Sequence, residues 1–283
     1  MNLTKVVITG GSGRIGTYLT NYLMDNVDVT VIDNKPPKNS DVRFVNANIL
    51  DFSVLESALE NHDGLIHLAG IPNPRMTTPD MTFHTNVQGV WNVLQAAENV
   101  GIKRAVVASS DTATGLLYNP PDWGPQYLPV DESHPLRPTD FYSLSKHVTE
   151  VICRSFGDRG KLQVIALRPS KVLTQDVVAE TQIPTSDISN FHLWAYVEHI
   201  DIAQASTLAL NISDISYDVF FISAANTLCS RPTLEMMAEK HGKLPEIRKP
   251  DIYESNPYAS IIDISHAREV LGYEPQSDWR RYT

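Results

Sequence analysis

The sequence of 283 residues predicts an α/β protein, a doubly wound parallel sheet with a small C-terminal α+β lobe. Through the first two thirds of the chain, short apolar runs alternate with amphipathic stretches of helical period. The runs are continuously apolar, which is typical of parallel strands covered by helices on both faces. From about Thr174 the alternation weakens, so we expect a main domain over residues 1–173 and a smaller lobe over 174–283, from which a strand and a helix can return to the main sheet.

The order of apolar runs and helical stretches gives the expected elements. Strands are predicted at Lys5–Thr9, Val27–Asp33, Val42–Val45, Gly64–Leu68, Arg104–Ser109 and Gln163–Leu167. Helices are predicted at Arg14–Met24, Ser53–Leu59, Met81–Val100 and Phe141–Phe156. In the lobe we expect a helix at Ile200–Asn211, a strand at Val219–Ile222, and short helices at Thr233–His241 and Ile264–Leu271. Helices between successive strands make the connections crossovers, which parallel strands require.

Composition and charge exclude several classes of protein. The net charge of -10 is spread along the chain, which argues against binding to a nucleic-acid backbone. The only cysteines, Cys153 and Cys229, are too few for a disulfide framework, and the nine histidines show no metal-ligand spacing, so no metal is predicted. The N-terminus lacks a signal-type apolar region and no run is long enough to span a membrane, so we expect a cytoplasmic protein with no membrane partner.

A glycine-rich turn, Thr9–Gly16, joins the first predicted strand to the first predicted helix. A tight turn, a close backbone approach to a pyrophosphate and close helix–strand packing are permitted by Gly10, Gly13 and Gly16. Arg14 and Ile15 open the helix, whose N-terminus attracts an anion. The turn therefore predicts a dinucleotide-binding, Rossmann-type domain.

The end of the second predicted strand indicates which dinucleotide is bound. Asp33 lies at the distance from the glycine turn where a carboxylate hydrogen-bonds the adenosine ribose. Because its charge repels a 2'-phosphate, we expect NAD rather than NADP. Lys35 and Lys38 follow closely and leave dual use open.

A tyrosine and a lysine four residues apart begin the predicted helix at Phe141–Phe156. This spacing places the phenol of Tyr142 and the ammonium of Lys146 on one face, where the cation is expected to lower the phenol pKa for acid–base chemistry. Alone, such a pair is most often an exposed helical pair. Here Ser109 and Ser110 end a strand at the same sheet edge and offer hydroxyls to a substrate alcohol.

Together these motifs resemble the extended short-chain dehydrogenase/reductases, which include nucleotide-sugar epimerases, dehydratases and sugar dehydrogenases. The resemblance covers nearly the whole chain. It rests on Thr9–Gly16, Asp33, His67–Gly70, Thr85–Gly89, Ser109–Ser110, Tyr142–Lys146, Arg168–Pro169 and Trp194–Val197.

The resemblance implies roles for further residues. Ser110 would be the catalytic hydroxyl beside Tyr142 and Lys146, and Lys146 would also hold the nicotinamide ribose. The remaining cofactor contacts would come from Asn48 and Ile49 at the adenine, Leu68, Ala69 and Gly70 along the dinucleotide, and Pro169 near the nicotinamide. Asn48 departs from the aspartate common in the family. Asn86 would either contact the cofactor or stabilise its helix.

Two departures from nucleotide-sugar enzymes concern the substrate. The segment Ser170–Leu193 is shorter than the one that grips the nucleotide in those relatives, and Thr114 replaces the tyrosine usual before Gly115. Both resemble uronate dehydrogenases and other enzymes of free sugars. Thr112 and Lys171 become candidate pocket residues, with Lys171 as an anchor for an anion or simply a surface lysine. Trp194 would stack on a sugar or pack in the core.

We therefore expect an NAD-dependent dehydrogenase acting on a carbinol of a free sugar or sugar acid. A nucleotide-sugar 4-epimerase that retains NAD is the alternative, and a non-catalytic NAD-binding protein on the same fold is a third. The resemblance also implies a homodimer formed through the helices at Met81–Val100 and Phe141–Phe156.

Overall fold

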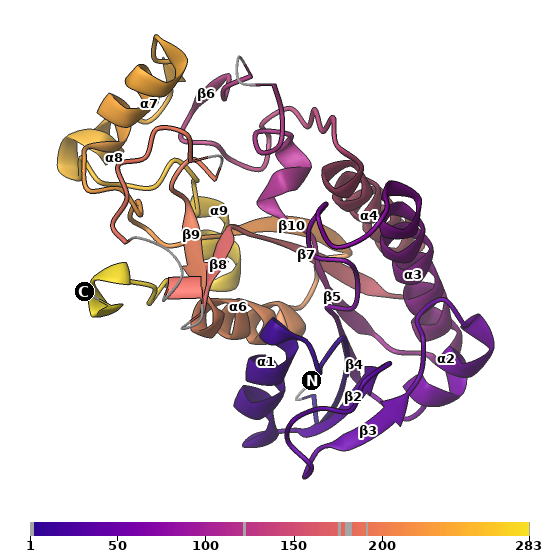
Figure 1. The fold of residues 1–283 in the computed structure, drawn as a ribbon. Helices are drawn as coiled ribbons and strands as arrows, with labels where there is room; N and C mark the ends of the chain where they lie inside the picture. The colour runs from indigo at the N-terminus through magenta and orange to yellow at the C-terminus, as the bar shows by residue number, and fades with distance from the viewer. Residues whose placement is uncertain (1–2, 121–122, 175–176, 179–182, 191, 283) are drawn as a thin grey trace.

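A seven-stranded parallel sheet forms the centre of the molecule (Figure 1). The computed structural model describes residues 3–120, 123–174, 177–178, 183–190 and 192–282. The strands are β1 (Lys5–Thr9), β2 (Asp28–Asp33), β3 (Arg43–Asn46), β4 (Gly64–His67), β5 (Arg104–Ala108), β7 (Gln163–Pro169) and β10 (Tyr217–Ile222). They are arranged in the order β10-β7-β5-β4-β1-β2-β3, and every neighbouring pair is parallel. The predicted fold class is confirmed.

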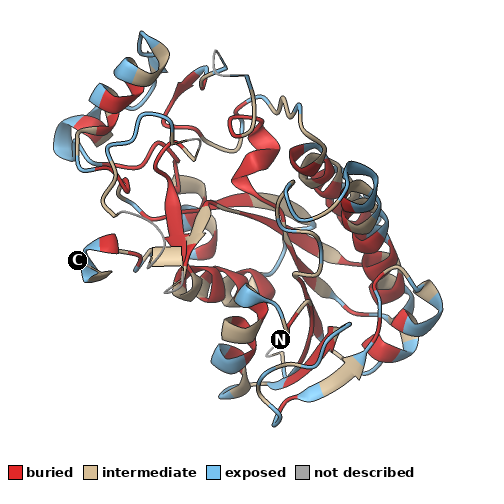
Figure 2. Cartoon of the chain, viewed as in Figure 1, coloured by how far each residue is buried: buried red, intermediate tan, exposed pale blue. Residues whose placement is uncertain are grey.

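Helices cover both faces of this sheet, as the continuously apolar strands predict (Figure 1). One face carries α2 (Phe52–Leu59), α3 (Pro79–Val100) and α4 (Phe141–Asp158); the other carries α1 (Arg14–Met24), α6 (His199–Asn211) and α9 (Ser265–Leu271). Because neighbouring side chains on a strand point to opposite faces, Val7 joins the buried cluster under the first group of helices and Val6 the cluster under the second. In Figure 2 the strands of the sheet are mostly buried, and the helices combine buried with exposed residues.

Short elements beside the carboxyl edge of the sheet build the smaller lobe. They are η1 (Asp111–Thr114), β6 (Tyr127–Leu128), β8 (Lys171–Leu173), β9 (Tyr196–Glu198), α7 (Thr233–His241), β11 (Glu246–Ile247), α8 (Pro250–Ser255) and η2 (Trp279–Tyr282). β6 pairs with β11, and β8 pairs with β9. Two elements beyond residue 173 contribute to the main domain: β10 pairs with β7 in the main sheet, and α6 packs against that sheet. Within the described ranges, no helix has the length and apolar character needed to cross a membrane.

The order of the strands reverses at β1 and β4. The chain passes from β1 to β2 and β3 on one side, and then returns to β4 on the other side of β1. Ligands of doubly wound sheets bind at such a reversal. The turn after β1, the segment after β5 and the first turn of α4 all lie at this edge of the sheet (Figure 1).

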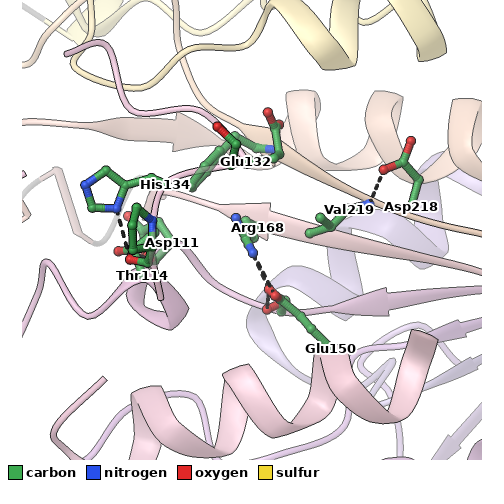
Figure 3. Close-up of polar contacts among 12 residues, drawn as sticks. Asp111, Thr114, Glu132, His134, Glu150, Arg168, Asp218 and Val219 are labelled. Carbon is green, nitrogen blue, oxygen red and sulfur yellow. Dashed lines mark hydrogen bonds and ion pairs between the residues drawn. The ribbon is translucent and has the colours of Figure 1, made fainter. Parts of the chain in front are cut away.

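A buried ion pair fixes α4 against the sheet (Figure 3). Arg168 on β7 donates to both carboxylate oxygens of Glu150 on α4, each at 2.8 Å, and the two residues are 2% and 4% exposed. Ser109, directly after β5, donates to the same carboxylate at 2.5 Å. Two parallel bonds between guanidinium and carboxylate restrict orientation as well as distance. The pair therefore sets the position of the helix that carries Tyr142 and Lys146.

Glu150→Ala should lower the free energy of unfolding by about 3–5 kcal/mol, because it leaves the Arg168 guanidinium buried without its partner. Denaturant unfolding followed by circular dichroism measures the loss. Glu235→Ala is the matched control, since it removes an exposed partner of Arg231 and should change stability little. An equally small loss for Glu150→Ala would show that the buried pair does not hold α4 in place.

Candidate active site

The turn after β1 has the shape of a phosphate cradle. Gly10 has a φ of +76°, and a Cβ there would lie 2.5 Å from the backbone nitrogen of Ala69. A Cβ on Gly16 would lie 2.2 Å from the carbonyl oxygen of Gly10. Gly13 is the N-cap of α1 and provides no side-chain cap, so the first-turn N–H groups at Arg14 and Ile15 face the end of the helix. A pyrophosphate fits this end of the helix.

The carboxylate of Asp33 lies against the same turn. It accepts hydrogen bonds from the backbone N–H of Ser12 at 3.1 Å and of Lys35 at 3.3 Å. This position, at the end of β2 and beside the glycine turn, suits a ribose that bridges the two. Lys35 and Lys38 are exposed. The residues predicted to bind the adenosine half of a dinucleotide are therefore brought together.

The other residues predicted to contact the cofactor follow β4, end β7 or lie between β3 and α2. Leu68, Ala69 and Gly70 directly follow β4, and Pro169 ends β7. Ile49 is buried, with its side chain against Gly89, whereas Asn48 is exposed and accepts from the N–H of Leu50 at 3.0 Å. Ile49 is thus fixed by α3, and Asn48 remains available at the surface.

The side chain of Asn86 links the segment after β4 to α4 by hydrogen bonds. Its side-chain oxygen accepts from the N–H of Ile71 at 2.7 Å, and its nitrogen donates to the carbonyl of Ile71 at 3.1 Å and to the hydroxyl of Ser145 at 3.0 Å. Both amide hydrogens are used in these bonds. Of the two predicted roles, this geometry favours the structural one, in which Asn86 joins the segment after β4 to α4.

Tyr142 is held at the start of α4 beside Ser110. Asp140 caps the helix by accepting from the N–H groups of Tyr142 and Ser143, at 3.0 and 2.9 Å. The Tyr142 side chain is buried, and burial raises its pKa above the usual range, while a hydrogen bond with the Ser110 side chain acts in the opposite direction. The predicted catalytic hydroxyl and phenol are therefore neighbours.

The expected lowering of the Tyr142 pKa by Lys146 is wrong for this structure. The ammonium of Lys146 donates to the carbonyl of Ala108 at 2.8 Å, and the loss of water around Tyr142 raises the phenol pKa. Burial also lowers the pKa of Lys146 to about 8. His67, hydrogen-bonded to Thr9 at 2.7 Å, has its pKa lowered to about 3 by burial and by the nearby Lys146. For the pKa of Tyr142, burial of the phenol outweighs the spacing of four residues that separates it from Lys146.

Asp111 is a buried carboxyl at this site to which the sequence analysis gave no role. It begins η1, is 4% exposed, and accepts from the hydroxyl of Ser110 at 3.2 Å. Burial raises its pKa to about 7, which outweighs the hydrogen bonds from Ser110 and from backbone N–H groups. An aspartate directly after the predicted catalytic serine was the available signal, but its burial depends on elements distant in sequence.

Two buried hydroxyl groups lie close in sequence to predicted site residues, one in η1 and one directly after β7. Thr112 and Ser170 are 4% and 3% exposed, and neither side-chain oxygen has a hydrogen-bond partner in the described part of the chain. Leaving a buried hydroxyl unpaired is unfavourable. Thr112 was predicted from the sequence, and Ser170 was not. Trp194 is fully buried and its indole N–H donates to the carbonyl of Asp187 at 3.2 Å, so the structure places it in the core.

Positive charge gathers near the start of β8. Lys171 is half-buried, and loss of water lowers its pKa; its ammonium makes no hydrogen bond or ion pair with any other described residue. His192 has its pKa lowered to about 3 by burial and by the nearby Lys171 and Arg75. Arg75 also acts on Tyr118, which in turn lies close enough to raise the pKa of Tyr142. These groups therefore border the catalytic residues.

Comparison with known proteins identifies the class. The model of the NAD dependent epimerase/dehydratase family matches residues 6–227, and the chain belongs to that family. The glycine cradle and Asp33 fit its cofactor, and the protein is an NAD-dependent enzyme of the extended short-chain dehydrogenase/reductase type.

Individual relatives differ in what they act on. The putative UDP-glucose 4-epimerase of Methanocaldococcus jannaschii is 28% identical, over 96% of this chain and 94% of its own. The L-arabinose 1-dehydrogenase (NAD(P)(+)) of Haloferax volcanii is 30% identical, over 75% of this chain and 84% of its own. The fold is shared with MoeE5 in complex with UDP-glucose and NAD, at a TM-score of 0.74 and 22% identity, covering 98% of this chain and 95% of that chain.

NAD should bind much more tightly than NADP, because Asp33 accepts from ribose hydroxyls and would face a 2'-phosphate with like charge. Calorimetric titration with each dinucleotide measures the difference. Asp33→Asn should narrow it, and Lys103→Met, a change of charge at the opposite edge of the sheet, should leave it unchanged. Equal affinities in the unmodified protein would mean that Lys35 or Lys38 neutralises the phosphate.

Proposed function

We propose that the protein is a dehydrogenase that oxidises a carbinol of a free sugar or sugar acid. The observation that carries this proposal is the short connection between β8, which directly follows β7, and β9. β8 begins two residues after the end of β7 and pairs with β9, which sets Lys171 opposite Tyr196, so only residues 174–195 connect the two strands. A nucleotide diphosphate requires protein contacts along its length to bind well. The short connection supports a smaller substrate.

The geometry supports a division of roles among three side chains. Tyr142 takes the carbinol proton, Ser110 hydrogen-bonds the reacting oxygen, and Lys146 holds the nicotinamide ribose. NAD supplies the hydride acceptor when bound. The chain contributes orientation and control of the proton at one buried point. Because burial raises the Tyr142 pKa, the phenol requires nearby positive charge to lose its proton near neutral pH.

An acidic sugar fits the charge around the pocket. Lys171 has no described counter-ion, and the neighbouring His192 is uncharged near neutral pH. A carboxylate or phosphate on the sugar would compensate this charge. The buried hydroxyls of Thr112 and Ser170 would pair with sugar hydroxyls. This arrangement supports Lys171 as the anion anchor.

A nucleotide-sugar 4-epimerase is the second candidate. It is favoured by the Methanocaldococcus relative, which aligns over nearly all of both chains. The same three catalytic side chains would serve both reactions. The two differ in the outcome, because a dehydrogenase releases the reduced cofactor and an epimerase retains it.

We also propose a homodimer formed through α3 and α4. Large apolar side chains are exposed on these helices at Met81, Trp91, Leu144 and Val151. A contiguous exposed apolar surface commonly marks an interface. Light scattering on the purified protein should give twice the chain mass of 31.5 kDa. A monomer mass at micromolar concentration would contradict the dimer.

Tyr142→Phe should reduce turnover about 10²–10⁴-fold while leaving the affinity for NAD nearly unchanged, because it removes only the oxygen that transfers the proton. Turnover is followed by the absorbance of reduced nicotinamide over a panel of aldoses, uronic acids and nucleotide sugars. Lys146→Ala should damage both turnover and NAD binding. Near-normal turnover of Tyr142→Phe would assign the proton to another residue, and interconversion of a nucleotide sugar without net reduction of NAD would favour the epimerase.

Lys171→Met should raise KM for D-galacturonate far more than for D-galactose, since the lost charge-assisted hydrogen bond is worth roughly 1.5–3 kcal/mol. The matched control is Lys103→Met, which removes an exposed lysine at the opposite edge of the sheet. Equal changes for the acid and the neutral sugar would place Lys171 outside the pocket. A change confined to turnover would give it a role other than anion binding.

A further inference from the structure

The hydroxyl of Ser110 has one proton and two oxygen neighbours. Its Oγ lies 3.2 Å from Asp111 Oδ1, to which it donates, and its side chain lies close enough to the Tyr142 hydroxyl to act on the pKa of that phenol. The backbone N–H of Thr112 already donates to the same Oγ at 3.2 Å. A hydroxyl donates one hydrogen bond and accepts up to two. Ser110 therefore cannot donate to Asp111 and to the catalytic centre at the same time.

The surroundings of Asp111 make its protonation sensitive to small changes. The residue is 4% exposed, and the groups that stabilise its charge are the Ser110 hydroxyl and backbone N–H groups, with no cation among them. Several elements packed against η1 carry titratable or charged groups. The helix α4 and its cap contribute Asp140, Tyr142, Lys146 and Glu150, and β7 contributes Arg168. Tyr118 lies nearby, and the loop that bonds to Thr114 contributes His134 and Arg137. Lys146 is held by Ala108, and Arg168 by Glu150. Among the residues that the structure describes, Asp111 thus lacks a dedicated counter-ion.

We propose that Asp111 is a positioning residue, whose gain or loss of a proton sets the direction in which the Ser110 hydroxyl donates. As a carboxylate, Asp111 accepts the Ser110 proton, and Ser110 can only accept from Tyr142. As a carboxylic acid, Asp111 donates its own proton to Ser110 Oγ, which turns the Ser110 proton toward Tyr142 and the reacting oxygen. The chain of hydrogen bonds from Asp111 to Tyr142 reverses as one unit.

This role has a consequence for the reaction. Only the protonated form of Asp111 lets Ser110 donate to a substrate oxygen or to a Tyr142 phenolate, and a charged Asp111 disfavours that phenolate directly. Burial brings the pKa of Asp111 to about 7, so both forms are populated near neutral pH. The inference rests on the site proposed above for Ser110 and Tyr142. It holds equally for a dehydrogenase and an epimerase.

Neutron crystallography of the deuterated, ligand-free protein tests the switch without a substrate. Crystals equilibrated well below and well above neutral pD should show Asp111 deuterated at the lower value and bare at the higher one. The Ser110 deuteron should point to Tyr142 at the lower pD and to Asp111 at the higher. A Ser110 deuteron that points to Asp111 at both values, or a carboxylate that never gains a deuteron, would overturn the proposal.

Unfolding measured against pH provides a second arm. The folded-state pKa of Asp111 lies above its unfolded value, so the unmodified protein loses stability as pH rises from about 4 to about 7 and changes little from this group above that. The folding equilibrium constant of Asp111→Asn, divided by that of the unmodified protein, should therefore rise by about a hundredfold or more from about pH 4 to about pH 7. In a Ser110→Ala background the gain should be larger, because the carboxylate has lost its side-chain donor.

Asp140→Asn is the matched control. It removes a nearby negative charge but keeps an oxygen to accept from the N–H groups of Tyr142 and Ser143 at the start of α4. It should not reproduce the pH-dependent gain. An Asp111→Asn gain that is the same with and without the Ser110 hydroxyl would mean that the two side chains are not coupled, and would overturn the positioning role whatever sugar the enzyme uses.

Discussion

The bidentate contact between Glu150 and Arg168 is the constraint on which the site depends. The residues of the candidate site come from three elements: Ser110 follows β5, Tyr142 and Lys146 lie on α4, and Pro169 ends β7. The buried pair joins α4 to β7 at 2.8 Å, and Ser109 extends the contact to β5. Replacing such a pair with apolar residues of matching volume often preserves stability, but it would not fix the orientation of a helix in the same way. The pair therefore supplies geometry more than net stability.

Burial governs the chemistry of the catalytic groups. Burial removes much of the water around Tyr142, Lys146 and Asp111, and it moves each pKa in the direction that favours the uncharged form: up for the phenol and the carboxyl, and down for the ammonium. Charge at one group consequently has a strong effect on its neighbours, because few water molecules are left to screen it. Because Ser110 lies between Asp111 and Tyr142, the titration of the Asp111 carboxyl and that of the Tyr142 phenol depend on each other.

The sequence predicted those features that depend on neighbours along the chain. The turn at Gly10–Gly16, Asp33 at the end of β2 and the Tyr142–Lys146 pair are local patterns, and each lies where it was expected. β8 and β9 are only three residues long, and they form by pairing with each other, with Lys171 opposite Tyr196. The periodicity of three residues is too short to predict such a pairing. The burial of Trp194 and Asp111, and the hold of Ala108 on Lys146, likewise come from contacts between distant segments.

A crystal structure with NAD and the sugar of highest turnover tests the central claim most directly, because it locates the reacting carbinol. The account predicts the carbinol oxygen within about 2.6–3.2 Å of both the Tyr142 and Ser110 hydroxyls, with any acidic group of the sugar at Lys171. A sugar bound with its carbinol away from these two hydroxyls would contradict the assigned chemistry. An ordered nucleotide between the lobe and the sheet would contradict the free-sugar substrate.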